Sequence, residues 1–412
     1  MLLPRPAIAG GVAAQTKRSP PRLVFHPRKG PMRSPPYRFG IEEEYFVIDL
    51  KTKNVRLAMP KKFFRACKRI LKDHVTNEML QSQIEVMTSP CETVVEAREQ
   101  ISYLRNTVAA EAARHNLGII AASTHPTALW HEQKLTEKVR YNEITKDVQI
   151  TGLRSLLCGM HVHVEVSDPD RRVELMVRAI PFLPLLLALS TSSPFWQGRR
   201  TGLAGYRQAA HEEMPRSGLP ELFRTVADYE AYINGLRDAE VVTDASHVWW
   251  DIRPSAFHPT LELRITDVCT RIEDAISIAS IYRCLIKHLS ENTQMNAHLD
   301  AVDRAFAEEN KWRAERFGTR ASFVERSTRT AQTLEAALGR LLIMLRPDAK
   351  ALGCIQEIEH ASEIAKRGSS ASAQVHVYAE ARLSGLSKTR ALKKVVAWLM
   401  RTTTQLREGV AA

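Results

Sequence analysis

Five short segments in which apolar and ionisable residues alternate constrain the fold of this sequence more than any other feature. Each would form a β-strand with one apolar and one ionisable face, because successive side chains of a strand point to opposite sides. Segments with helical periodicity separate them, so the sequence predicts a mixed α+β sheet with helices on one side and leaves the strand order open. The five segments are Phe39–Asp49, Gln81–Thr88, Met160–Val166, His247–Pro254 and Leu261–Val268.

The helical segments have signals at their ends. A helix over Thr93–Leu117 is expected to begin with Thr93 as its N-cap, with Glu96 three residues on, and to stop at Gly118. From about Ser322 onward the pattern predicts helices alone. The other expected helices are Lys61–Lys72, Val173–Leu189, Ile272–Leu289, Asp303–Arg313 and the amphipathic, basic Lys388–Leu406.

Composition is typical of a soluble globular protein. Of the 412 residues, 44% are hydrophobic and 25% are charged, which are ordinary fractions. The longest apolar run, Ile180–Leu189, contains two prolines and is shorter than the ~20 residues of a membrane span. The six cysteines include no C-x-x-C pair, a pattern that indicates reduced thiols. We therefore expect a cytoplasmic protein with no membrane partner.

The net charge of +12 is concentrated at the N-terminus. Residues 1–35 contain seven Lys and Arg and no acid, together with seven of the twenty prolines. Such a segment is expected to be a disordered, dispensable extension. The remaining chain is nearly balanced in charge, which makes nucleic acid an unlikely partner. We expect residues 36–412 to form one catalytic domain and leave the subunit number open, a homo-oligomer included.

The ionisable faces of the five segments carry mostly acids and no lysine, whereas solvated strand faces favour Thr, Lys, Ser and Gln. Two carboxylates two residues apart on a strand lie ~7 Å apart and repel by roughly 2.4 kcal/mol at an effective dielectric constant of ~20. Exposure to water would remove this cost, and so would divalent cations. The candidate ligands are Glu42, Glu44, Glu85, His161 and Glu262, an oxygen-rich set that favours Mg²⁺ or Mn²⁺ over zinc.

Two arginines, Arg253 and Arg264, share these faces and require anionic partners. Phosphate groups would serve, because a guanidinium group binds them with two hydrogen bonds. Metal ions and arginines on an acidic sheet are typical of phosphoryl transfer. The chain has neither a Walker lysine loop nor a G-x-G-x-x-G motif, so metals and arginines would have to hold a nucleotide.

Six short motifs, taken in order along the chain, resemble those of bacterial carboxylate–amine ligases of the glutamate–cysteine ligase type 2 family. The resemblance runs from about Tyr37 to about residue 370, and its motifs are specific only in combination. They are Gly40-Ile41-Glu42-Glu43-Glu44, Gln83-Ile84-Glu85-Val86, Thr124-His125-Pro126, His161-Val162-His163-Val164, Trp250-Asp251-Ile252-Arg253-Pro254-Ser255 and Leu261-Glu262-Leu263-Arg264.

This resemblance implies a curved antiparallel sheet of about six strands backed by helices, similar to glutamine synthetase catalytic domains. It implies ATP, two or more Mg²⁺ ions, an acyl-phosphate intermediate, and an amide formed from a glutamate-like acid and an amine such as cysteine. Members similar to this chain are credited with weak glutamate–cysteine ligase activity. By position in the motifs, Glu42, Glu44, Glu85, His161 and Glu262 match metal ligands, and Arg264 matches a phosphate contact.

Several further residues remain candidates. Arg253 is expected to contact phosphate or substrate, and Arg207, in an expected loop after Ser193, could touch phosphates. Glu78 is a weaker candidate ligand because it lies outside the strand face. Glu165 stands where family members often have glycine, and it would be an extra ligand, a bulkier pocket wall or the base that deprotonates the amine.

Two alternatives stay open. His161-Val162-His163 could be the metal pair of an amidohydrolase-like hydrolase, with His211, His247 and His258 as further ligands. The chain could instead be a non-enzymatic protein that binds anions or nucleic acid through its basic tail and C-terminal helix. ATP dependence and polyanion affinity distinguish these readings from a ligase.

Overall fold

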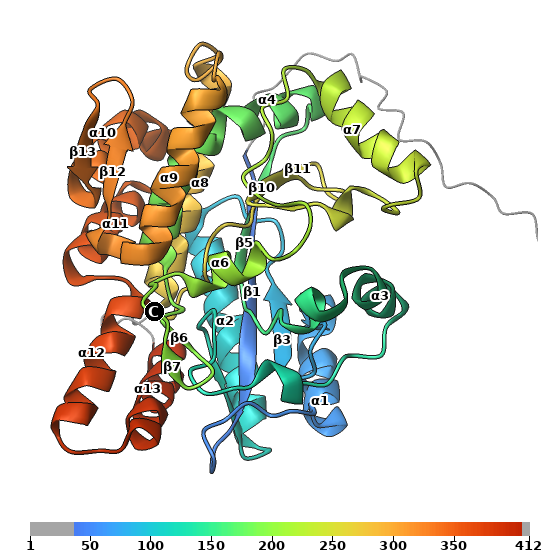
Figure 1. Cartoon of the computed structure of the whole chain (residues 1–412), viewed down its shortest axis with the longest axis vertical. Coiled ribbons are helices and arrows are strands. Elements are labelled where there is room, and N and C mark those ends of the chain that lie inside the picture. Colours follow the sequence, from blue (N-terminus) through green and yellow to red (C-terminus); the bar gives the residue numbers. More distant parts are fainter. Residues whose placement is uncertain (1–36, 406–412) are drawn as a thin grey trace, which may run out of the picture. The chain divides into compact units, whose positions relative to one another are not determined.

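A seven-stranded antiparallel sheet forms the centre of the computed structural model, which describes residues 37–405 (Figure 1). The strand order is β10-β11-β5-β1-β3-β2, and β4 also pairs with β1. The α+β fold class is confirmed, with one strand more than the expected number. The extension predicted for residues 1–35 lies outside the described residues. The strands are β1 (Phe39–Asp49), β2 (Val75–Asn77), β3 (Gln83–Met87), β4 (Leu117–Ile120), β5 (Met160–Glu165), β10 (Ile252–Pro254) and β11 (Thr260–Leu263).

Helices cover the apolar face of this sheet. α2 (Val94–Ala113) packs on β1, β3 and β4, and α8 (Ile272–Glu291) packs on β5 and α2. Beneath them Ile41, Ile84 and Val162 are fully buried, as the alternation of side chains predicts. The remaining large helices are α1 (Lys61–Leu71), α3 (Val139–Leu153), α4 (Pro169–Ala179), α5 (Leu183–Ser190), α7 (Val226–Asp238), α9 (Ala301–Phe317), α10 (Leu334–Ala351), α11 (Ile355–Arg367), α12 (Ser370–Leu383) and α13 (Lys388–Thr403).

The second glutamate of β1, Glu43, points into this apolar core, away from Glu42 and Glu44. It is fully buried and accepts hydrogen bonds from Arg105 Nε at 2.7 Å and from Tyr45 Oη at 2.5 Å. Arg105, also fully buried, donates to the carbonyl oxygens of Cys269 and Thr270. This ion pair therefore ties β1 and α2 to the segment that leads into α8.

The start of α2 matches its prediction, but its end does not. Thr93 and Glu96 form the expected capping box. The helix stops at Ala113, because Asn116 adopts a left-handed backbone (φ 57°) that reverses the chain into β4. Gly118 therefore lies in a strand, where a Cβ atom would come within 2.4 Å of Met400 Cε on α13.

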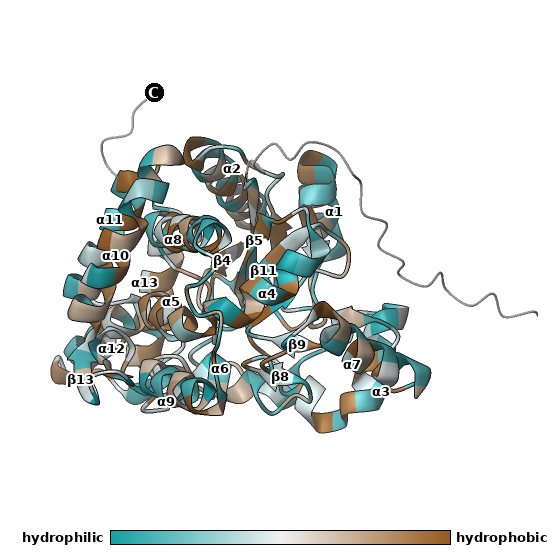
Figure 2. Cartoon of the chain, turned by 90° about the horizontal axis from the view of Figure 1, so that it is seen from above, coloured by the Kyte–Doolittle hydropathy of each residue, from teal (hydrophilic) through white to brown (hydrophobic). Residues whose placement is uncertain are grey.

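The prediction of helix alone after Ser322 is wrong at its start. A hairpin of β12 (Ser322–Glu325) and β13 (Thr330–Thr333) precedes α10. The side chain of Asn310 on α9 pairs with both the N–H and the carbonyl of Val324, which fixes the hairpin on that helix. Within the described residues four further helices, α10 to α13, follow the hairpin, and α13 packs directly on β4. The apolar α5, seen from above in Figure 2, contacts α8, α9, α10 and α11.

Four of the five predicted strands are shorter than expected, and only Phe39–Asp49 has its predicted bounds. His247–Pro254 divides at Asp251 into β9 (Trp249–Trp250) and β10, while β11 ends at Leu263. The carbonyl of Asp251 accepts hydrogen bonds from the amides of both Arg264 and Ile265, and its carboxylate binds the fully buried Lys311 at 2.7 Å. Such a bulge interrupts the ladder between the strands. β9 pairs instead with β8 (Ser217–Gly218) in parallel.

One helical run in the described residues, Pro169–Ser190, is long and apolar enough to cross a membrane. It is longer than predicted because a 3₁₀ turn, Ile180–Phe182, joins α4 to α5. Of its most apolar window, 78% is buried inside the protein, as in the core helix of a soluble protein. All six cysteines are buried, free thiols.

Candidate active site

The ionisable face of the sheet lines a pocket of about 460 Å³. We call it the acid-lined pocket after Glu42, Glu44, Glu78, Glu85 and Glu262, which lie in its wall. α3 and the short helix α6 (Tyr206–His211) contribute to the same wall, so this side of the sheet also carries helices. The other charged or histidine side chains of the wall are Lys138, Arg140, His161, His163, Arg207, His211, Arg253, His258 and Arg264.

Strand register brings these side chains together. Glu44 on β1 lies directly opposite Glu85 on β3, and Glu42 lies opposite His161 on β5. On the other edge of β5, His163 lies opposite Glu262. Directly opposed residues of an antiparallel pair have Cβ atoms only ~5 Å apart. Four strands therefore place their ionisable groups within reach of one another.

Three carboxylates, those of Glu44, Glu78 and Glu85, form a cluster whose ligand atoms all lie within 4.8 Å of one another. Burial and the charge of Glu78 raise the pKa of Glu44 to about 8, although Arg207 and the Gly159 N–H, at 2.7 Å, oppose the shift. Burial and the neighbouring carboxylates raise the pKa of Glu85 well above its ordinary value. Burial also raises the pKa of Glu78. Burial is thus the main reason that ionisation of this cluster is disfavoured.

Glu42 has two histidine neighbours. Its carboxylate lies 3.4 Å from His161 Nδ1 and 3.3 Å from His163 Nε2. Burial opposes ionisation of Glu42, but the two histidines together lower its pKa. Burial and the charge of Arg264 lower the pKa of His161 to about 4, so this imidazole is neutral at pH 7 and retains a free lone pair.

Glu262 lies between two arginines. Arg253 Nε donates to its Oε2 at 2.9 Å, and Arg264 Nη1 donates to its Oε1. Burial opposes ionisation, but Arg253 and Arg264 hold the pKa of Glu262 well below its ordinary value. The arrangement fixes both guanidinium groups in the pocket wall.

The third arginine of the pocket, Arg207, is 4% exposed and comes from the first turn of α6. Its Nη2 atom donates to the carbonyl of Arg264 at 3.2 Å. The guanidinium lies so close to Gly159 that a Cβ atom there would come within 2.6 Å of Nη2. Glycine at this position therefore makes room for Arg207.

The donor set fits divalent cations that prefer oxygen ligands. Besides Glu44, Glu78 and Glu85, two groups satisfy the same 4.8 Å criterion: Glu42 with Glu85 and His161, and Glu42 with His163 and Glu262. Each contains at least two carboxylates and at most one imidazole, the chemistry that suits Mg²⁺ and Mn²⁺. Burial and the neighbouring carboxylates raise the pKa values of Glu44 and Glu85 in the first group, so a cation bound there would have to displace protons.

Comparison with known proteins identifies the family. Residues 38–393 match the model of glutamate–cysteine ligase family 2 (GCS2). The chain belongs to this family. A relative from Bradyrhizobium sp. strain ORS 278, named "Putative glutamate--cysteine ligase 2", is 47% identical over 87% of this chain and 88% of its own length. A relative of the same name from Rhodospirillum rubrum is 41% identical over 90% of this chain and 97% of its own length.

Solved structures show the same fold. A glutamate–cysteine ligase from Francisella tularensis, crystallised in complex with AMP, superposes with a TM-score of 0.67 and 11% identity over 90% of both chains. A bifunctional glutathione synthetase from Pasteurella multocida gives a TM-score of 0.61 and 13% identity over 89% of this chain and 52% of its own. The fold expected from the motifs is thereby confirmed, and the enzyme class is that of a ligase.

All eight site residues proposed from the sequence of this GCS2 member lie in the wall of the acid-lined pocket. They are Glu42, Glu44, Glu85, His161, Arg207, Arg253, Glu262 and Arg264. Their roles as ligands and phosphate contacts stay predictions. Glu165 is not in the wall, since its carboxylate pairs with Arg38 Nε at 2.8 Å. His125 accepts hydrogen bonds from Thr127 and Ala128 amides, a loop-stabilising role.

The pocket contains residues that the sequence did not indicate. Lys138 Nζ and Tyr141 Oη on α3 both donate to the carbonyl of Asn77, at 2.8 and 3.0 Å, which ties the helix to the segment before Glu78. α3 brings Ile144 to an apolar cluster with Val148, Met214 and Trp249 beside the acids. The helical periodicity of residues 139–148 is the one sequence signal that could have predicted that a helix forms this part of the pocket wall.

Proposed function

We propose that this GCS2 member is an ATP-dependent carboxylate–amine ligase that forms an amide through an acyl phosphate. The observation that carries the proposal is the cluster of Glu44, Glu78 and Glu85 beside Arg253 and Arg264 in one pocket. A glutamate-like acid and an amine, with cysteine as the first candidate, are the substrates that the relatives' names support. The AMP complex of the Francisella ligase supports a nucleotide as co-substrate.

Mg²⁺ or Mn²⁺ would be held by Glu44, Glu78 and Glu85, and by Glu42 with Glu262 and the histidines of β5. A bound divalent ion supplies charge neutralisation for the phosphates and acts as a Lewis acid. Around it the chain itself provides mostly positioning and electrostatic stabilisation.

Arg253, Arg264 and Arg207 would bind phosphate oxygens. Glu262 orients the first two, and the carbonyl of Arg264 orients the third. The γ-phosphoryl group would pass from ATP to a carboxylate oxygen of the acid, giving ADP and the acyl phosphate. The amine nitrogen would then attack the acyl carbon, lose a proton, and release inorganic phosphate as the C–O bond breaks.

Water must be kept from an acyl phosphate. Ile144, Met214 and Trp249 line the pocket beside the acids, and Val148 packs with them in one apolar cluster. Such a wall lowers the local water content and strengthens electrostatic interactions inside. We assign this part of the pocket the task of protecting the intermediate.

A substrate screen tests the proposal. ATP, Mg²⁺, glutamate and a panel of amines are supplied, and phosphate release is measured with each component omitted in turn. Release that requires both organic substrates supports a ligase. With glutamate labelled by ¹⁸O in its side-chain carboxylate, the released phosphate should carry one ¹⁸O atom. Unlabelled phosphate would exclude the acyl-phosphate route, and hydrolysis of an amide without ATP would favour the hydrolase alternative.

Metal binding should depend on pH. Because the pKa of Glu44 is raised from 4.5 to about 8, the folded metal-free protein holds this proton more tightly than the unfolded chain does. Its stability should therefore fall as pH rises from about 4.5 to 8. A cation replaces the proton, so Mg²⁺ should raise the melting midpoint more at pH ~8.5 than at pH ~6. Equal shifts at both pH values would contradict this assignment of the ligands.

A further inference from the structure

A second cavity, of about 610 Å³, shares no lining residue with the acid-lined pocket. Its walls come from the end of the hairpin β6 (Phe195–Trp196)–β7 (Arg199–Arg200), the C-terminus of α9, the end of α11 and the start of α12. We call it the basic cavity after five cationic residues in its wall, which are Arg200, Arg316, Arg320, Lys366 and Arg367.

The basic cavity contains an excess of positive charge. Glu335 is the only carboxylate residue among its lining residues. Within residues 37–405, Arg200, Arg316 and Arg320 pair with no carboxylate, and Arg316 donates to the carbonyl of Gly202. The other two cations have carboxylate partners, since Arg367 pairs with Asp274 and Lys366 Nζ lies 3.7 Å from Glu363. The cations come from separate elements, so the fold brings them together and they are not one run of basic residues in the sequence. Like charges gathered in a cavity repel one another unless an anion lies among them.

Other groups in the wall suit an anion. α12 begins at the cavity, where Ala371 and Ser372 of its first turn lie in the wall, and the N-terminus of a helix carries partial positive charge. Hydroxyl groups of Thr319, Ser322 and Thr333 add neutral donors. Guanidinium groups bind both phosphate and carboxylate with two hydrogen bonds.

We propose that the basic cavity is a second ligand site, which binds a small multivalent anion bearing phosphate or carboxylate groups. The volume lies in the range of small-molecule sites. The site also adjoins the acid-lined pocket through the backbone. Leu203 and Ala204 line the cavity. The amides of Ala204 and Gly205 donate hydrogen bonds to the carbonyl of Glu315 at 2.7 and 2.9 Å. Gly205 immediately precedes α6, the helix that carries Arg207.

Calorimetric titration of the full-length chain tests this site. Inorganic pyrophosphate and citrate are used in separate titrations, with EDTA present and ~0.15 M KCl to suppress diffuse attraction. Without divalent ions the acid-lined pocket offers little attraction to an anion. We expect saturable binding of at least one probe, and the affinity of the Arg200→Gln/Arg320→Gln variant should be at least about 10-fold lower.

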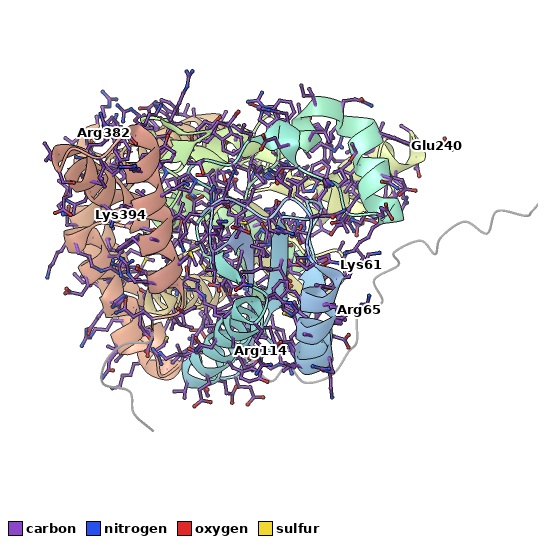
Figure 3. The ribbon with its side chains drawn as sticks, turned by 90° about the horizontal axis from the view of Figure 1, so that it is seen from below. Lys61, Arg65, Arg114, Glu240, Arg382 and Lys394 are labelled. Atoms are coloured by element: carbon purple, nitrogen blue, oxygen red, sulfur yellow. The ribbon has the colours of Figure 1, made fainter. Side chains whose placement is uncertain are left out.

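Matched variants locate the binding. Lys393→Gln/Lys394→Gln removes two exposed cations from α13, outside both cavities; Lys394 is labelled in Figure 3. Arg264→Lys alters the acid-lined pocket instead. Both variants should keep the affinity of the unaltered protein. Arg200→Gln/Arg320→Gln and Lys393→Gln/Lys394→Gln should show an unchanged melting midpoint, because these four residues are exposed.

The outcomes separate as follows. Binding of pyrophosphate alone identifies a phosphate site, and binding of citrate alone identifies a carboxylate site. The proposal is overturned by no binding of either probe, by an equal loss in Lys393→Gln/Lys394→Gln, or by a loss confined to Arg264→Lys. None of these results depends on turnover, so the ligase proposal stands or falls independently.

Discussion

Replacing Glu262 by Gln is expected to lower kcat/KM of the ligase reaction by about 10²–10³-fold or more. Glu262 is 3% exposed and receives hydrogen bonds from Arg253 and Arg264. An amide of the same volume removes the negative charge that orients both guanidinium groups and removes one carboxylate from the group formed with Glu42 and His163. Both consequences weaken stabilisation of charge in the transition state. Steady-state kinetics with saturating Mg²⁺ measure the effect.

Glu165→Gln provides the matched control. Glu165 lies on β5, opposite Thr260 on the strand that carries Glu262, and is likewise paired with an arginine, but outside the acid-lined pocket. Its replacement should leave kcat/KM within about twofold, because a partly exposed ion pair contributes little. If Glu262→Gln kept full activity, the assignment of the site would be wrong. If Glu165→Gln lost activity, its sequence-based role as the amine's base would regain support.

Replacing Glu43 by Gln should destabilise the fold by about 3–5 kcal/mol. Glu43 and Arg105 are both fully buried, and loss of the carboxylate leaves a guanidinium charge uncompensated in the core. The same substitution leaves Tyr45 without its charged acceptor. Urea titration followed by circular dichroism measures the loss as a shift of the unfolding midpoint.

A double variant distinguishes charge from packing in this ion pair. Glu43→Leu/Arg105→Met removes both charges, and most of the lost stability should return, because the desolvation of two buried ions is avoided. As the exposed counterpart, Arg346→Gln breaks the surface pair with Glu359 and should barely move the midpoint. A midpoint for Glu43→Gln equal to that of the unaltered protein would show that the pair is dispensable for the fold.

The alternation of side chains in β1 made much of the site predictable. Alternation along a strand puts Glu42 and Glu44 on one face and Glu43 on the other, and the structure has this arrangement. The period of a strand is 2, so once the strand is recognised its two faces are determined by sequence alone. The same reasoning placed Glu85, His161 and Glu262 correctly in the pocket.

Residues outside the strands could not be predicted in this way. Glu78 precedes β3, and contacts from a distant segment hold it at the pocket: Lys138 and Tyr141 bind the carbonyl of Asn77, and Thr136 binds that of Glu78. Arg207 was expected in a loop, and its burial depends on Gly159 of a distant segment. Contacts between segments far apart in sequence have no local signal.

The division of a predicted strand at Asp251 has a similar cause. The sequence Trp250–Pro254 alternates as one strand would. However, Lys311 on α9 binds the Asp251 carboxylate, and the Asp251 carbonyl accepts hydrogen bonds from the amides of Arg264 and Ile265. Tertiary contacts thus override a regular local pattern.

The three consecutive glutamates of β1 also determine which sequence changes this strand tolerates. β1 is held on both edges, by β3 on one side and by β5 and β4 on the other. If Phe39–Ile41 keep their pairing with β5, a single residue gained or lost between Ile41 and Glu42 would shift the run by one step, turning Glu43 outward and Glu42 and Glu44 into the apolar core. The length of this segment is therefore more constrained than the identity of its residues. Most point substitutions here would impair either the core or the pocket, whereas a one-codon insertion or deletion would abolish the fold and the site together.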